Sequence, residues 1–503
     1  MIALSRRLVR LRPVDQPSHS AGARRILLNS GFRLFADVGS KLASLVLVIV
    51  MARELGAAPL GAFTLALSLG ALLATFGRLG QQSVLTRAVA RDRAQVHDYF
   101  SNTVALQLVF ALPAVGLAIV FAPLFGLDSE LRLLVGVMAL AAFLEAVVAT
   151  CFSVYQAYER LGFIPVVLIA QRWLTAGAGT IAILLGADVE LIGVLYLGGV
   201  LVAIALAWRL LRRHVVSVRW SVDPRRWLPL LRAALPIGLA GVFNTVLFRI
   251  NIAMLAGYAS TTVVGYYGAV YRAFESSLFL SWSIAAAVYP VFARLGSHTE
   301  PTVQLVFDRS LKMAAAFSLP VAAGAMVLAE PVVTLIYGEG FAPAAGALVL
   351  LGPAFALYPI GYLGSQLLVA RDRQRVLAPT YAVIAVVNIG LNLVLIPALS
   401  LEGAALSTSI SQLLVAVALG AFAVRTAGGI DPARILTGPV IATLVASGAM
   451  VLLRDHVLVA VGVATLAYLI TLYLVERRAY PDDVAVLSDV VRPRRASGDL
   501  ASL

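Results

Sequence analysis

Runs of about 20 mainly apolar residues recur from Asn29 to Glu476, and they limit the possible folds more than any other feature of the chain. A helix of that length crosses ~30 Å of hydrocarbon at a rise of 1.5 Å per residue. Of the 503 residues, 60% are hydrophobic and 13% charged, which is more apolar surface than a soluble core can hide. The sequence therefore predicts an all-α integral membrane protein with about 14 transmembrane helices.

The basic residues are distributed unevenly between the connections. The net charge is +13, and arginines crowd the first 28 residues, the 78 to 93 and 209 to 232 connections, residues 371 to 375 and the tail. This alternation follows the positive-inside rule and is not typical of a nucleic-acid-binding surface. It predicts a multi-pass protein of the cytoplasmic (inner) membrane with both termini in the cytoplasm and no nucleic acid partner.

The longest basic connection divides the apolar runs into two sets of six. Weak internal similarity supports a duplication, because Gly61-Ala-Phe recurs as Gly265-Tyr-Tyr. Parallel repeats place a substrate path at their interface. The predicted order is a cytoplasmic N-terminus (1–28), an N-lobe of six helices (29–211), a basic interlobe loop (212–230), a C-lobe of six helices (231–425), two further helices (435–476) and a cytoplasmic tail (477–503).

Six basic side chains lie inside the apolar runs, where a cation costs at least ~2.5 kcal/mol on insertion scales. We expect Lys312, which begins its helix beside Arg309, to be an interfacial anchor. The other five are predicted to face a polar path between the lobes and to bind an anionic group. The six are Arg33, Lys41, Arg172, Arg249, Arg272 and Lys312.

The first helix carries Arg33, Asp37 and Lys41 at intervals of four, so all three share one face. A static ladder of ion pairs that holds the bundle together would explain them. However, one carboxylate cannot neutralise two cations, and the surplus charge favours an anionic ligand.

Arg249 and Arg272 fall near the same end of two consecutive helices, and Glu275 lies one turn from Arg272. Arginine suits an anionic ligand because its planar group donates two hydrogen bonds and stays ionised. A simple salt bridge for Arg272, and snorkelling to the interface for Arg249, are the structural alternatives.

Glu145 stands alone near the middle of its helix. It could couple transport to a proton, or pair with Lys41 or Arg172. We therefore assign Asp37, Glu145 and Glu275 to charge pairing or ion coupling.

Several short patterns occur in a fixed order along most of the chain. They are Ala52-Arg53-Glu54-Leu55-Gly56 with Gly61-Ala62-Phe63, Gln156-Ala-Tyr-Glu-Arg160, Val264-Gly-Tyr-Tyr with Tyr271-Arg272, Tyr289-Pro290, and Asn388 to Asn392 with Glu402-Gly-Ala-Ala405. Together they resemble the polysaccharide (O-antigen-type) flippases of the multidrug/oligosaccharidyl-lipid/polysaccharide (MOP) exporter superfamily. One departure is Arg249-Ile-Asn251, where many relatives have an acidic residue shortly after the arginine, so neither a charge pair nor an ion site is expected there.

That resemblance implies two six-helix bundles around a V-shaped cavity, and turnover of an undecaprenyl-pyrophosphate-linked oligosaccharide by alternating access. It implies a lipid-linked oligosaccharide and membrane lipid as partners, with a polysaccharide polymerase or glycosyltransferases as possible further ones. Tyr267 and Tyr271 are then candidate glycan contacts, because sugar rings stack on such faces. Interfacial belts and ordinary packing explain the same residues, and packing is the favoured interpretation. A lipid II flippase fits the charge equally well. A cation-coupled multidrug exporter would need an acidic path instead.

An enzyme such as a polymerase or a glycosyltransferase is the alternative from another class. The outward connections are too short to hold a catalytic domain, and the five histidines lie in tails or loops. Cys151 is the single cysteine, and the chain has no GxxxxGK[ST] motif. We therefore predict a transporter with no catalytic residues, metal site or cofactor.

Overall fold

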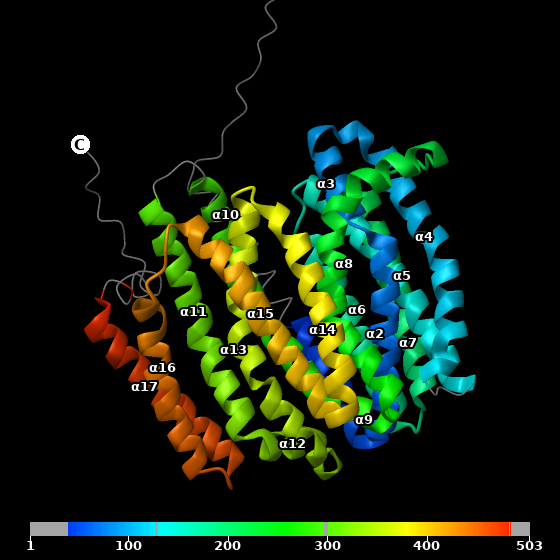
Figure 1. Ribbon diagram of the computed structural model, residues 1–503. Helices are drawn as coiled ribbons and strands as arrows, with labels where there is room; N and C mark the ends of the chain where they lie inside the picture. The colour runs from blue at the N-terminus through cyan, green and yellow to red at the C-terminus, as the bar shows by residue number, and fades with distance from the viewer. Residues whose placement is uncertain (1–38, 126–128, 296–299, 482, 484–503) are drawn as a thin grey trace, which may run out of the picture.

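The structure, a computed structural model, describes residues 39–125, 129–295, 300–481 and 483 (Figure 1). Thirteen helices in these ranges are long and apolar enough to cross a membrane. Residues 39–50 form the end of a further helix, which continues into the π-helix η1 (Met51–Leu55). The predicted all-α membrane fold is confirmed. Arg33 and Asp37 lie outside the described residues.

The first set of helices is α2 (Ala57–Arg78), α4 (Val96–Phe121), α5 (Ser129–Ala157), α6 (Phe163–Leu184) and α7 (Val189–His214). Each follows an apolar run of the sequence. A shorter helix, α3 (Gln81–Arg91), occupies most of the connection that the sequence marks as a basic loop. Its apolar residues Leu85 and Val89 are fully buried, whereas Arg87 and Arg91 point outward, so an amphipathic pattern explains it.

The second set is α8 (Trp227–Tyr258), α9 (Thr261–Ser277), α10 (Phe279–Arg294), α11 (Glu300–Val327), α13 (Ala345–Ala370), α14 (Leu377–Leu399) and α15 (Leu401–Ala427). A turn at Leu278 separates α9 from α10. The connection between α11 and α13 is not an irregular loop. It folds as α12 (Ala329–Tyr337) and the 3-10 helix η6 (Glu339–Ala344).

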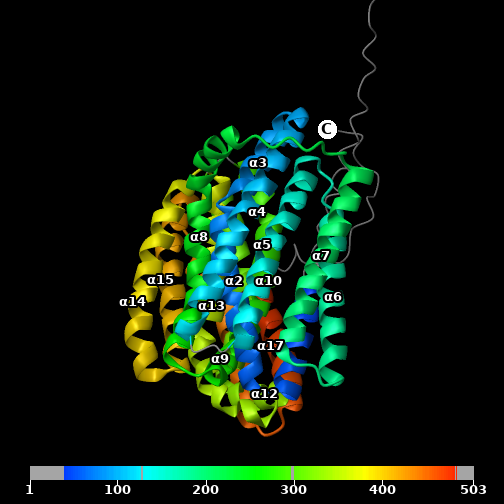
Figure 2. The same ribbon diagram turned by 90° about the vertical axis from the view of Figure 1, so that its right-hand side faces the viewer.

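The last two helices, α16 (Pro432–Leu452) and α17 (Val457–Ala479), pack on each other, and α16 packs on α11. They lie at the edge of the molecule opposite α4 and α5 (Figure 1). Figure 2 shows α6 and α7 at one side, α14 and α15 at the opposite side, and α2 with α8 between them. The lobe boundaries at residues 211 and 231 stay a prediction.

Two glycines bring α2 and α9 into backbone contact at one end of the molecule. A Cβ on Gly61 would lie 1.8 Å from the carbonyl oxygen of Thr261, and one on Gly265 would lie 1.8 Å from that of Ala57. These residues form two small-xxx-small pairs, Ala57 with Gly61 and Thr261 with Gly265, which allow helices to approach closely. The repeated motif of the sequence therefore marks a contact between its own two copies.

A second close contact lies at the other end of α2. Leu79 and Gly80 adopt left-handed conformations between α2 and α3, with φ of 34° and 77°. A Cβ on Gly80 would lie 2.7 Å from the carbonyl oxygen of Ala234, and one on Gly238 would lie 2.3 Å from the carbonyl carbon of Leu79. Helix α2 thus contacts α9 near its start and leads into a contact with α8 at its end.

Amide side chains join α8, α14 and α15 in the core. The Asn392 amide donates to Asn251 at 2.6 Å and to Asn388 at 3.1 Å, and Asn251 donates to the hydroxyl of Thr408 at 2.6 Å. All four residues are almost completely buried. Neutral amides can satisfy one another in this way without a counter-ion. Asn251 therefore serves a packing network where the resemblance would have suggested a carboxylate.

Candidate functional site

Arg249 of α8 and Arg272 of α9 share the carboxylate of Glu275. The distance from Arg249 Nη2 to Glu275 Oε1 is 2.8 Å, and that from Arg272 Nη1 to Glu275 Oε2 is 3.2 Å. Arg272 and Glu275 are one helical turn apart, whereas Arg249 comes from the preceding helix. The predicted proximity of the three residues is confirmed, and Arg249 forms an ion pair instead of snorkelling.

Glu145 of α5 pairs with Arg172 of α6. Its Oε1 atom accepts hydrogen bonds from Gln171 at 3.0 Å, from Arg172 at 3.2 Å and from the hydroxyl of Tyr196 at 2.9 Å. Arg172 also donates to the Tyr196 hydroxyl at 2.8 Å. Of the partners that the sequence left open for Glu145, the structure selects Arg172. Sequence reasoning missed Tyr196, since a single tyrosine in the apolar run of α7 gives no signal.

Lys41 of the first helix lies between these two groups. Its Nζ is 4.9 Å from the ring centroid of Trp282 in α10. It is within electrostatic range of Arg172 on one side and of Arg249, Arg272 and Glu275 on the other. We call the following residues the central cluster: Lys41, Glu145, Arg172, Arg249, Arg272 and Glu275.

Among the residues that the structure describes, the central cluster has four basic side chains and two carboxylates, so positive charge is in excess. The side chains of Arg172 and Arg249 are 27% and 19% exposed, so part of each is accessible to a ligand. The arrangement is suited to an anion, because arginine forks match the oxygens of a phosphate.

The two tyrosines proposed as glycan contacts are buried. Tyr267 has no exposed surface, and its hydroxyl lies 2.9 Å from that of Thr408. Tyr271 is 3% exposed and donates to the carbonyl oxygen of Phe248 at 2.8 Å. In this structure both rings pack in the core, so the prediction of glycan contact from Tyr267 and Tyr271 is replaced by the packing alternative.

The prediction of an interfacial anchor at Lys312 is wrong. Lys312 is buried in α11 and forms ion pairs with Glu476 of α17 and, at 3.0 Å, with Asp483. Asp483 also lies 2.9 Å from Arg309 and 2.6 Å from Arg434 of α16. We call these five residues, together with Asp308, the peripheral cluster. No pattern in the sequence predicts that Asp483, which follows α17, would contact Arg309 and Lys312 of α11.

Charge pairing alters the acidity of Asp483, which lies beyond the last membrane span. Burial raises the pKa of Asp483. Hydrogen bonds from Arg434, Lys312 and Arg309 lower this pKa by more than burial raises it, so it is held well below the usual range. The carboxylate is therefore ionised at neutral pH and joins α11, α16 and the end of α17.

Residues 26–296 match the family described as "Polysaccharide biosynthesis protein". This match covers more than half of the chain. The chain belongs to the polysaccharide biosynthesis protein family. One relative is the "Probable low-salt glycan biosynthesis flippase Agl15" of Haloferax volcanii, which is 22% identical over 393 residues, covering 76% of this chain and 81% of the relative.

Solved structures of low sequence identity share the fold of this family member. "Lipid II flippase MurJ, inward closed conformation" matches with a TM-score of 0.74 and 16% identity, over 90% of this chain and 99% of that one. An inward-facing MATE family transporter of the MOP superfamily matches with a TM-score of 0.66 and 18% identity, over 77% and 94% of the two chains. These structures show the fold. Together with the family match and the flippase relative, they confirm the predicted membership of the MOP superfamily and the prediction of a transporter and not an enzyme.

Proposed function

We propose that this protein flips a polyprenyl (undecaprenyl) pyrophosphate-linked oligosaccharide from the inner to the outer leaflet of the cytoplasmic membrane. The observation that carries the proposal is the excess of positive charge in the central cluster. A pyrophosphate brings the negative charge that the cluster lacks. Both termini would lie in the cytoplasm. Enzymes that assemble the glycan would act at the inner leaflet, and enzymes that polymerise it would act at the outer leaflet.

Neighbouring side chains already orient the arginines of the central cluster for such a headgroup. Glu275 fixes Arg249 and Arg272 from one side, which leaves further donors of each guanidinium for a ligand. Arg172 is held in the same way by Glu145 and Tyr196. Because these side chains are already oriented, a pyrophosphate would bind with little loss of side-chain entropy.

Alternating access would supply the movement across the membrane. Helix α2 contacts α9 at Gly61 and Gly265, and the turn after α2 contacts α8 at Gly80 and Gly238. We take these as two contacts between the predicted lobes. Opening one contact while the other stays closed would expose the central cluster to one side of the membrane at a time. No covalent step is required, since transport needs only different headgroup contacts in the two states.

Lipid II transport is the second candidate, since lipid II also carries a pyrophosphate. It draws on the shared fold of the lipid II flippase structure, which at 16% identity leaves the substrate open. The cation-coupled multidrug exporter is disfavoured. A cationic drug would meet four basic side chains and two carboxylates that are already paired.

Substitution of Arg272 by glutamine tests the proposal. Arg272→Gln leaves the 2.8 Å pair between Arg249 and Glu275 in place, so Glu275 is not left unpaired. We expect turnover of an undecaprenyl-pyrophosphate glycan in proteoliposomes to fall at least roughly tenfold, the value of one charge-assisted hydrogen bond. Arg309→Gln, in the peripheral cluster, is the matched control and should keep the wild-type rate.

Equal turnover by wild type and Arg272→Gln, at equal amounts of folded protein, would overturn the proposal. The same vesicles loaded with lipid II decide between the two candidates. Transport of lipid II in preference to the oligosaccharide would replace the first candidate with the second.

A further inference from the structure

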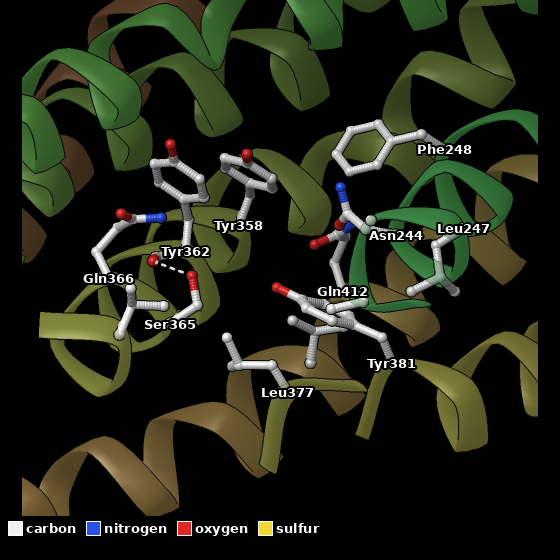
Figure 3. Close-up of a pocket in the computed structure, with 14 residues that line it drawn as sticks. Asn244, Leu247, Phe248, Tyr358, Tyr362, Ser365, Gln366, Leu377, Tyr381 and Gln412 are labelled. Carbon is white, nitrogen blue, oxygen red and sulfur yellow. Dashed lines mark hydrogen bonds between the residues drawn. The ribbon is translucent and has the colours of Figure 1, made fainter. Parts of the chain in front are cut away.

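A separate cavity of about 230 Å³ lies inside the second lobe, among α8, α13, α14 and α15. Figure 3 shows its aromatic and amide side chains converging on one space. Fourteen residues line it, and none of them is charged. We propose that this cavity binds one neutral sugar ring of the transported glycan. The inference rests on the proposed function and adds a subsite to it.

Three amide side chains of the lining have unused hydrogen-bonding capacity. Asn244, Gln366 and Gln412 make no side-chain hydrogen bond to other residues within the described part of the chain. Each amide offers donors and an acceptor together. Sugar hydroxyls have the same dual character, so a pyranose could satisfy all three. Gln412 is 6% exposed, which places its amide inside the lobe and away from bulk water.

The aromatic residues of the lining supply a flat wall. The rings of Tyr358 and Tyr362 are stacked, with centroids 5.5 Å apart and an interplanar angle of 14°. Phe248 meets Tyr358 edge to face at 6.0 Å, and the hydroxyl of Tyr381 points into the space (Figure 3). The C–H face of a sugar packs on such rings, while its hydroxyls reach the amide side chains of the lining.

The chemistry of the lining disfavours other ligands. A metal ion or an anion is disfavoured, because the lining has no carboxylate and no basic side chain. A lipid tail would cover the three amides without satisfying them, at a cost of about 1–3 kcal/mol for each buried unpaired group. Pockets for drug-sized ligands start at about 300 Å³, so this cavity is suited to one ring and not to a whole oligosaccharide.

Neighbouring side chains connect the cavity to the central cluster. Phe248 precedes Arg249 in α8. Tyr358 accepts a hydrogen bond from the indole of Trp282 at 2.7 Å, and the Lys41 ammonium lies over the ring of Trp282. A headgroup with its pyrophosphate at the central cluster would thus meet the cavity wall next.

The cavity also lies toward the end of the lobe where the basic connection 371–376 joins α13 to α14. Val369 and Leu377, which flank that connection, both line the cavity. The positive-inside pattern places this end in the cytoplasm. The sugar subsite would therefore be on the loading side of the proposed transport cycle.

Saturation-transfer NMR with free methyl glycosides tests the subsite without any lipid or pyrophosphate. The full chain is placed in nanodiscs free of maltoside or glucoside detergent, which would compete as sugars. We expect saturation of ring protons for a hexoside or an N-acetylhexosaminide. Gln412→Leu and Asn244→Leu should each weaken binding by roughly tenfold, the value of one or two hydrogen bonds.

Gln374→Leu is the matched control, since Gln374 is exposed in the connection and does not line the cavity. Size-exclusion profiles verify that each variant is folded. If Gln412→Leu does not fold, Asn244→Leu alone tests the subsite. Failure of every glycoside to bind, or binding that both leucine variants leave unchanged, overturns the subsite.

The transport assay of the previous section is read separately. Turnover without glycoside binding overturns the subsite and leaves the proposed function standing. Glycoside binding without turnover of any pyrophosphate-linked glycan overturns the proposed function and leaves a sugar-binding cavity.

Discussion

The central and the peripheral clusters both place several cations among apolar helices, but their charge balance differs. The central cluster has four basic residues and two carboxylates, drawn from the first helix, α5, α6, α8 and α9. The peripheral cluster has three basic residues, Arg309, Lys312 and Arg434, and at least as many carboxylates, Asp308, Glu476 and Asp483.

This difference separates a structural role from a binding role. A cation within a membrane helix is costly unless it is paired or faces water. In the peripheral cluster the three cations share Asp483, Lys312 also pairs with Glu476, and these pairs join α11 to α16 and α17. In the central cluster Arg249 and Arg272 share Glu275, and Lys41 forms no ion pair within the described part of the chain. We propose that substrate supplies the missing negative charge. The excess charge, and not the position inside a helix, indicates the substrate path.

Removal of the shared carboxylate should have the largest effect on stability. Glu275→Gln leaves Arg249 and Arg272 without an acidic partner among the described residues, and breaking a buried pair costs about 3–5 kcal/mol. We expect a clear drop in the midpoint of thermal unfolding in detergent. In Glu145→Gln, Arg172 keeps the Tyr196 hydroxyl, so the drop should be smaller. Equal unfolding temperatures for Glu275→Gln and wild type would show that the central cluster does not need Glu275 as a counter-ion.

Much of the fold could be predicted because apolar length alone determines a membrane span. The apolar runs that correspond to α2, α6 and α16, for example, all form helices. The break at Leu278 and the helices α3 and α12 were missed, since short elements at the membrane edge give no long apolar run. Hydropathy shows where a chain crosses the membrane, but not where it bends.

The candidate site was predictable only in part. Arg272 and Glu275 are one helical turn apart, so their pairing follows from the 3.6-residue period, and the antiparallel connection brings Arg249 near them. Lys312 meets Glu476 and Asp483 across more than 160 residues of sequence, and no periodicity encodes such a contact. The same limit hid the cavity, whose amides come from α8, α13 and α15.

The peripheral cluster should affect stability without affecting transport. Asp483→Asn removes the carboxylate shared by Arg309, Lys312 and Arg434, and we expect a loss of about 2 kcal/mol, the value of a charge-assisted hydrogen bond. Thermal unfolding measures the loss, and glycan turnover per folded molecule should equal that of wild type. A fall in turnover of the folded variant would contradict the separation of the two clusters.

The pH dependence of that loss should identify ionised Asp483 as its source. Hydrogen bonds from Arg434, Lys312 and Arg309 outweigh burial and hold the pKa of Asp483 below its unfolded value of about 3.9. A depressed folded pKa stabilises the protein above the unfolded pKa, and this contribution is lost as the pH falls through the folded pKa. The difference in unfolding temperature between wild type and Asp483→Asn should thus stay constant from about pH 7 to about pH 5 and shrink below about pH 4. If the difference instead disappears in the neutral range, Asp483 is not held by its three cations in solution, and the balanced charge of the peripheral cluster is not what joins α17 to α11.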